Sequence, residues 1–313
     1  MICGLFGRTR QAHYKINRTE EKLALKNAVI IKSVQQIRET MPRIGTRKLK
    51  FLLDEMLSKH GITIGRDSLF KLLEEYGLLV RRRKKRKVIT TDSDHPFWKY
   101  PNLIRDLVVT DTDQLWVSDI TYIPLGNGFC YLSLVSDACS RKIIGFSLYP
   151  NLKKEGPLAA LRMALNSSQR RAEHSLIHHS DRGLQYCCAE YTDLLSSFAI
   201  TISMTEKGDP YENAIAERIN GILKSEFCLD KVFKSYQHAL EAVTAAITTY
   251  NTERPHTSLG YDTPHQAHIK HLNQNQHEPV ILSNCKPKAG SGKPACKLET
   301  ELRKKVSTDT SII

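Results

Sequence analysis

Residues 115–125 read Leu-Trp-Val-Ser-Asp-Ile-Thr-Tyr-Ile-Pro-Leu, a stretch that alternates in the manner of a β-strand. The turn Gly126-Asn127-Gly128 follows it, and two further strand-like runs occupy 129–136 and 141–149. Three strands in immediate succession predict an antiparallel meander. Asp119 lies in the middle of the first strand, where an acid is costly unless a cation neutralises it.

Helices and short strands alternate after the meander. Helical spacing of apolar residues is found at 157–169, 189–198, 213–227 and 236–250, and strand-like runs are found at 175–179 and 200–204. This order predicts an α/β core with a mixed sheet, which we expect to occupy residues 108–270. Residues 271–313 are polar and rich in Pro, Gly and Lys towards their end, which predicts a mostly disordered tail.

Residues 1–80 predict a helical module. A first helix is expected over 21–41, with Leu25, Val29, Ile30, Val34, Ile37 and Met41 on its apolar face. Thr46 can cap a second helix, and a third, over 66–76, should bury Leu69, Leu72, Leu73 and Tyr76. Helix, short turn and helix is typical of a helix-turn-helix, whose last helix would present Arg66 and Lys71 to a major groove. A helical hairpin that only packs would show the same pattern.

The positive charge of the chain is concentrated at its front. The formal net charge is +13; residues 1–100 hold 23 Lys and Arg against 10 Asp and Glu, and the remaining residues hold 23 of each. Residues 81–107 are expected to be a linker, and seven consecutive cations begin it: Arg81, Arg82, Arg83, Lys84, Lys85, Arg86 and Lys87. Such a run would bind a phosphate backbone in a strongly salt-dependent way, so nucleic acid is the expected partner.

Composition excludes several other classes of protein. With 41% hydrophobic residues the chain can build a real core, yet it has no apolar run of about 18 residues that could span a membrane. The N-terminal stretch lacks the layout of a signal peptide, and the eight cysteines show no C-x-x-C spacing. We therefore expect no membrane partner and a cytoplasmic, nucleoid-associated protein.

Three acids stand out from the predicted elements. Asp119 lies within a strand, Asp181 directly follows a short strand and precedes Gly183, and Glu217 lies on a predicted helix. Asp181 and Glu217 each have an ordinary explanation when taken alone. Asp181 could form a turn, and Glu217 could be a solvated residue on a polar helix stripe that Asn213, Asn220 and Lys224 share. Their spacing changes the interpretation, because 61 residues separate the first pair and 35 separate the second.

Five ordered motifs carry a family resemblance. They are Trp116-x-x-Asp119-Ile-Thr-Tyr122, His179-Ser-Asp181-x-Gly183-x-Gln185-Tyr186, Asn213-Ala-x-x-Glu217, Lys224 seven residues later, and Tyr250-Asn251-x-x-Arg254-Pro255-His256-x-Ser258-Leu259. Together with the D-D-(35)-E spacing they resemble the downstream-frame transposases of the IS3 family, within the retroviral-integrase-like DDE superfamily. The resemblance runs from about Leu5 to Ala267 and implies an RNase H-like catalytic core behind an all-α helix-turn-helix domain.

The resemblance also implies a mechanism. Asp119, Asp181 and Glu217 would be the catalytic residues and the ligands of two Mg²⁺ or Mn²⁺ ions, and all-oxygen donors suit such hard cations. Lys224 would contact phosphate near the cut. Taken by themselves, Tyr250, Asn251, Arg254 and His256 are expected to fix the end of their helix against the core, although Arg254 could still reach DNA. The implied activity is metal-dependent strand cleavage at the terminal inverted repeats of an insertion sequence, followed by strand transfer into target DNA. An upstream-frame protein, or a frameshift fusion with it, and a homo-oligomer are implied as partners.

Two other functions remain compatible with these residues. A catalytically idle DNA-binding regulator could keep the same fold, although an intact set of acids argues against it. A structure-specific nuclease or ribonuclease H would share the metal site, and it would cut without joining strands.

Overall fold

The computed structural model describes residues 10–80, 96–168, 175–206 and 213–277. One compact unit of the chain extends to Asn275, and of the second unit, 276–313, only the two residues that end the last helix are described. The basic run from Arg81 to Lys87 and most of the expected tail lie outside the described residues. In the described part, no helix combines the length and the apolar character needed to cross a membrane.

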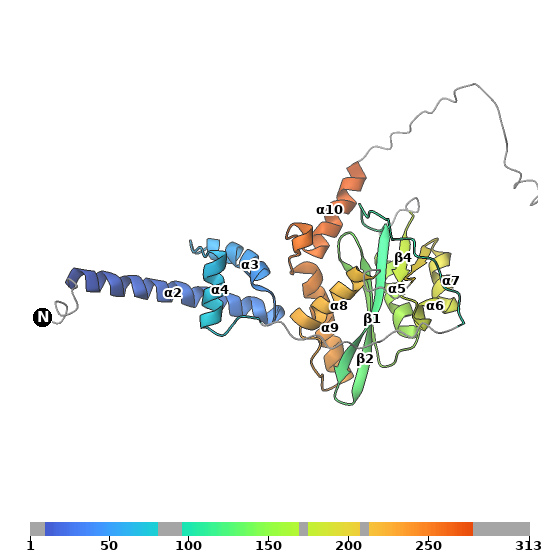
Figure 1. Ribbon diagram of the computed structural model, residues 1–313, viewed down its shortest axis with the longest axis horizontal. Coiled ribbons are helices and arrows are strands. Elements are labelled where there is room, and N and C mark those ends of the chain that lie inside the picture. The colour runs from blue at the N-terminus through green and yellow to red at the C-terminus, as the bar shows by residue number, and fades with distance from the viewer. Residues whose placement is uncertain (1–9, 81–95, 169–174, 207–212, 278–313) are drawn as a thin grey trace, which may run out of the picture. The chain divides into compact units, whose positions relative to one another are not determined.

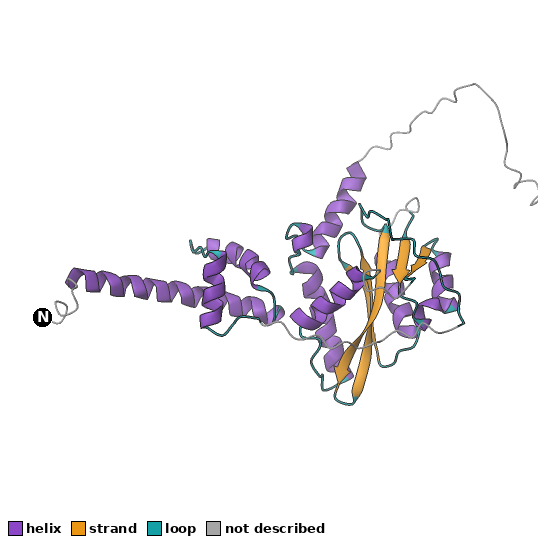
Figure 2. Cartoon of the chain, viewed as in Figure 1, coloured by secondary structure: helices purple, strands orange, loops and turns teal. Residues whose placement is uncertain are grey.

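A five-stranded mixed sheet forms the centre of the expected catalytic region, residues 108–270 (Figures 1 and 2). Its strands, in the spatial order β3-β2-β1-β4-β5, are β1 (Leu115–Leu125), β2 (Gly128–Asp137), β3 (Ile143–Tyr149), β4 (Ile177–Ser180) and β5 (Thr201–Met204). The first three pair antiparallel, and the Leu125–Gly128 pair closes the expected tight turn between β1 and β2. Strand β4 pairs parallel with β1, and β5 pairs parallel with β4. This meander, extended by parallel strands that follow helices, is the RNase H-like topology, so the predicted fold class is confirmed.

Helices cover both faces of this sheet. α5 (Glu155–Ser167), α6 (Leu184–Cys187) and α7 (Ala189–Ser197) bury one apolar cluster with Trp116, Val135 and Ile144. α8 (Ala214–Glu226) and α9 (Tyr236–Thr252) contribute to a second cluster with Ile123 and Leu132. Because successive side chains of a strand point to opposite faces, neighbours such as Leu134 and Val135 belong to different clusters.

Two elements complete the catalytic region. A short 3₁₀ helix, η1 (Thr257–Leu259), follows α9, and α10 (Pro264–His277) follows η1. The expected end of the core at residue 270 therefore falls inside a helix, which continues to His277.

Three helices precede the sheet as expected: α2 (Arg10–Thr40), α3 (Thr46–Ser58) and α4 (Arg66–Glu75). Ile30, Val34, Ile37 and Met41 are buried together with Leu49, Leu53, Leu57, Leu69, Leu72 and Leu73. Three expected core residues are exposed instead, namely Leu25, Val29 and Tyr76, because α2 runs beyond the helices that pack on it and Tyr76 lies past the end of α4. The expected cap is also wrong, since Gly45 rather than Thr46 precedes α3.

Candidate active site

The pairing of β1 with β4 aligns the first two acids. Val117 of β1 is the partner of His179 of β4, and Asp119 and Asp181 each lie two residues further along these parallel neighbours. Asp119 is still within β1, whereas Asp181 has just left β4. Both side chains are half-buried, so they are reachable from one edge of the sheet. This side lies at the carboxyl end of β4, and open α/β sheets bind their ligands at the carboxyl ends of their strands.

Helix α8 brings the third acid to the same place. Asn213, which precedes the helix, donates a hydrogen bond from Nδ2 to the carbonyl oxygen of Ser118 at 3.0 Å. Asn220 donates from Nδ2 to Oδ2 of Asp119 at 2.7 Å. Glu217 lies between these two anchors in the first turn of α8, and its side chain is exposed. The stripe that looked like a solvated helix face is therefore the surface by which α8 contacts β1.

The pKa of Asp119 reflects its burial and its two acidic neighbours. Burial and the negative charge of Asp181 raise the pKa of Asp119 to about 7. The hydrogen bonds from Asn220 and from the Ile120 backbone N–H oppose this rise, whereas Glu217 adds to it. A bound cation would relieve the repulsion that raises this pKa.

The two asparagines are site residues that the sequence reasoning missed. It assigned Asn213 and Asn220 to a polar stripe, but both are buried. Within the part of the chain that is described, their Oδ1 atoms are enclosed and accept no hydrogen bond. Their spacing of seven residues, two turns of a helix, predicts correctly that they share one side of the helix with Glu217, but it does not show that this side is packed against β1.

The donor set at this edge fits a hard divalent cation. Asp119, Asp181 and Glu217 supply only carboxylate oxygens, and Mg²⁺ and Mn²⁺ prefer such ligands. Among the described residues, no group of three or more His, Cys, Asp or Glu side chains is arranged so that it could hold a metal ion in this structure. Repulsion between carboxylates opposes closer approach until a cation offsets it.

Lys224 faces the same acids from one helical turn beyond Asn220. Burial lowers the pKa of Lys224, while the nearby carboxylates of Asp119 and Asp230 act in the opposite direction. The side chain is half-buried, and of the three acids Asp119 is the one whose charge acts on it.

Comparison with known proteins identifies the family. Residues 110–210 and 199–264 match two family models, both described as an integrase core domain. The chain is 32% identical to an insertion element IS600 protein of Shigella sonnei over 84% of its own length and 96% of that protein. It is 31% identical to the transposase for insertion sequence element IS629 of Shigella sonnei over 75% and 77%. It is 35% identical to the transposase InsF for IS3A of Escherichia coli over 54% and 59%.

The chain belongs to the IS3-family insertion-sequence transposases. These are DDE-type enzymes that cleave DNA and transfer its strands, so the transposase acts on DNA. Integrase core domains use divalent metal ions, in agreement with the all-carboxylate donor set at the sheet edge. The predicted family and activity are thus confirmed.

A buried polar layer lies beneath the acids of the transposase. Ser118, next to Asp119, places its Oγ 2.7 Å from Nε2 of His178, and the hydroxyl of Tyr191 lies 3.0 Å from the same nitrogen. Burial, with a smaller effect of His179, lowers the pKa of His178 to about 3. His178 is therefore a neutral structural residue that joins β1, β4 and α7.

The signature after the catalytic helix has a structural role. Tyr250 donates a hydrogen bond from its hydroxyl to the carbonyl oxygen of Arg141, and the Asn251 amide pairs with both backbone groups of Ile143. Arg254 is 2% exposed and donates from Nε and Nη2 to the two carboxylate oxygens of Glu226, at 2.8 and 2.9 Å. The suggestion that Arg254 reaches DNA is wrong, because its guanidinium is held in this interior ion pair.

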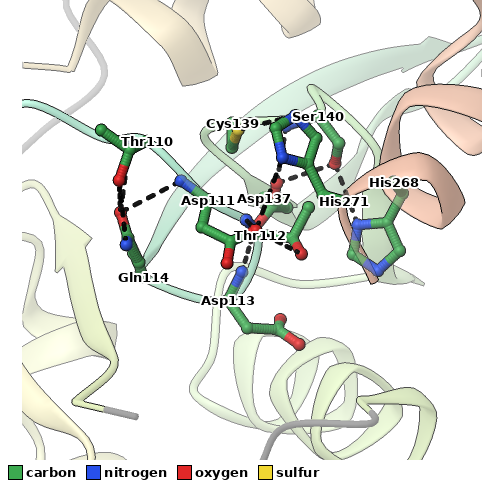
Figure 3. Close-up of polar contacts among 10 residues, drawn as sticks. All are labelled: Thr110, Asp111, Thr112, Asp113, Gln114, Asp137, Cys139, Ser140, His268 and His271. Atoms are coloured by element: carbon green, nitrogen blue, oxygen red, sulfur yellow. Dashed lines mark hydrogen bonds and ion pairs between the residues drawn. The ribbon is translucent and has the colours of Figure 1, made fainter. Parts of the chain in front are cut away.

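A second polar cluster lies at the other end of β1 (Figure 3). Asp137, fully buried at the end of β2, accepts hydrogen bonds from the Asp113 N–H and from Ser140, and burial raises its pKa to about 6. His268 of α10 contacts Ser140 in turn, at 3.0 Å. These contacts hold loops and α10 in place, so Asp137 belongs to a turn rather than to the group of Asp119, Asp181 and Glu217.

The helical module presents the expected cations to solvent. Arg66 and Lys71 of α4 are both exposed, and Arg66 forms an ion pair with its neighbour Asp67. Leu69 between them points into the module core. This orientation is the one that a groove-binding helix requires.

Proposed function

We propose that Asp119, Asp181 and Glu217 are the catalytic acids and that they hold two Mg²⁺ or Mn²⁺ ions. The observation that carries this proposal is that Asp119 has two acidic neighbours, one of which directly follows β4 while the other lies on α8. When bound, the ions would supply Lewis acidity at the scissile phosphate and its attacking oxygen. Asp119, Asp181 and Glu217 would together hold the ions through their carboxylate oxygens.

The substrate is the terminal inverted repeat of the insertion sequence. Water attacks the phosphorus at the element end, and the P–O3′ bond breaks to release a 3′-hydroxyl. That hydroxyl then attacks a second phosphodiester in the target, forms a new P–O bond and displaces another 3′-oxygen. Lys224 lies beside the acids, where it would contact a phosphate oxygen near the cut.

DNA is held mainly by the front of the chain. Arg66 and Lys71 would enter a major groove on α4, and their exposure supports this assignment. The cations at 81–87 would follow the phosphate backbone. An upstream-frame protein, or a fusion with it, and a second copy of the chain would complete the assembly on two element ends.

The deciding experiment uses the purified chain, alone and fused to the upstream frame, with labelled duplex ends of the parent element in Mg²⁺. Asp119→Asn and Glu217→Gln should both abolish nicking and joining while DNA binding survives. Asp193→Asn, an exposed acid on α7, is the matched control and should retain activity. Binding without chemistry in both forms, even in Mn²⁺, would favour the regulator, and cutting without joining would favour the nuclease.

A further inference from the structure

Glu226, the last residue of α8, lies between two cations from distant parts of the chain. Arg254, after α9, donates two hydrogen bonds to its carboxylate from one side. Lys48 of α3 donates a third from Nζ to Oε1 at 2.6 Å. A single carboxylate therefore joins the helical module to the catalytic region.

The three charges are largely removed from water. The exposed fraction of the side chain is 2% for Arg254, 14% for Lys48 and 15% for Glu226. Burial by itself would raise the pKa of Glu226, but the hydrogen bonds and charges of Arg254 and Lys48 outweigh burial and lower it. Ion pairs of this kind depend on geometry, because each partner that moves away leaves a buried charge behind.

Further contacts surround this ion pair. The Arg43 backbone N–H donates to the carbonyl oxygen of Glu226 at 3.0 Å, so the turn between α2 and α3 is hydrogen-bonded to the last residue of α8. The rings of Phe51 and Tyr261 stack at 4.8 Å between centroids. Apolar residues of the module and of the α8–α9 face belong to one contiguous buried cluster. The module is therefore packed on the catalytic region at this point.

We propose that Glu226 is a positioning residue which couples the DNA-binding module to the catalytic helix. α8 carries Glu217 and Lys224 on the same rigid element, so whatever holds its last residue sets their distance from α4. The Lys48–Glu226 contact would thus fix where DNA bound by the module meets the three acids. The second half of this inference rests on the proposed role of the module in DNA binding.

The test measures the Lys48–Glu226 contact and DNA cleavage separately in the full chain. Lys48→Met removes the cation but leaves the Arg254–Glu226 pair, whereas Lys48→Arg keeps the charge. Lys50→Met is the control on the same helix, because the ion pair of Lys50 with Asp54 lies within α3. Hydrogen exchange of peptides covering residues 41–47 reports whether the module stays packed on the catalytic region in the free protein. Labelled element ends report binding and cleavage.

Lys48→Met should speed exchange at residues 41–47 by about tenfold or more. It should slow end cleavage by about tenfold or more, because a misplaced substrate reacts slowly, while the Kd for end DNA changes less than about twofold. Lys48→Arg should restore both, and Lys50→Met should change neither. Unchanged exchange in Lys48→Met would show that Lys48 does not hold the module on the catalytic region. Faster exchange with normal cleavage would show that this contact does not position the DNA. If DNA protects no part of α4 in the wild-type chain, the proposed role of the module in DNA binding fails instead. The exchange comparison still decides whether the Lys48–Glu226 contact holds the module in place.

Discussion

Asn220 donates a hydrogen bond from Nδ2 to Oδ2 of Asp119 at 2.7 Å, so the catalytic helix orients the acid at the centre of the sheet. The backbone N–H of Ile120 holds the other oxygen at 2.8 Å. Asp119 is thereby held by one donor from its own strand and one from α8. This arrangement explains how a carboxylate is tolerated within an otherwise apolar strand.

Replacing Asn220 with Leu should lower the rate of end cleavage by about 10- to 100-fold, because Asp119 loses the donor that orients it. The side chain volume is kept, so the fold should persist by circular dichroism. Cleavage of labelled element ends in Mg²⁺ is the measurement. Ser225→Ala is the matched control on α8, since the exposed hydroxyl of Ser225 donates a hydrogen bond to the carbonyl oxygen of Gly221 in the same helix. Equal rates for the two variants would contradict the role of Asn220.

Gly145→Ala should unfold or severely destabilise the transposase, by about 3 kcal/mol or more. A Cβ at this position of β3 would lie 2.1 Å from the carbonyl oxygen of Ala160 and 2.8 Å from the backbone nitrogen of Ala164. Backbone atoms of α5 cannot yield as a flexible side chain can. Denaturant unfolding measures the loss. Gly126→Ala, which meets no atom within 4 Å, should be nearly neutral, and similar losses for both would refute the close approach of α5.

Acid should weaken the fold through His178. Burial lowers its pKa to about 3, against 6.5 for a free histidine, so the neutral form is favoured in the folded state. As the pH falls from 6.5 towards 3, the unfolded chain binds a proton that the folded chain excludes. The free energy of unfolding therefore falls by up to about 1.4 kcal/mol per pH unit from this group. His178→Gln should flatten the curve by that amount, whereas the exposed His60→Asn should leave its slope unchanged.

Arg254 and Lys71 should separate stability from DNA binding. Arg254→Gln breaks a buried ion pair with Glu226 and should cost about 3 kcal/mol of stability, without changing the salt dependence of DNA binding by the folded protein. Lys71→Ala should leave stability within about 0.5 kcal/mol and lower the slope of log K against log salt by about 1. Thermal unfolding and binding titrations at several salt concentrations check both. A reduced slope in Arg254→Gln would place this residue on DNA after all.

Local patterns were sufficient for most of the elements and for the family. The alternation at 115–125, the tight turn at Gly126-Asn127 and the helical periods depend on residues that are near in sequence, so they can be recognised from sequence alone. The spacing of Asp119, Asp181 and Glu217 marked the acids because related enzymes space them alike. The errors occurred where burial depends on distant partners, as for Leu25 and Val29 on the unpacked part of α2.

The sequence by itself determined the α/β order, the three acids and the basic front of the chain, because these are properties of composition, period and spacing. Only the tertiary structure decided what those residues touch. It turned Asn213 and Asn220 from a polar stripe into the contact between α8 and β1, and it placed Arg254 in the interior against Glu226. Side-chain burial and pairing are set by elements far apart in the chain, and no local pattern contains that information.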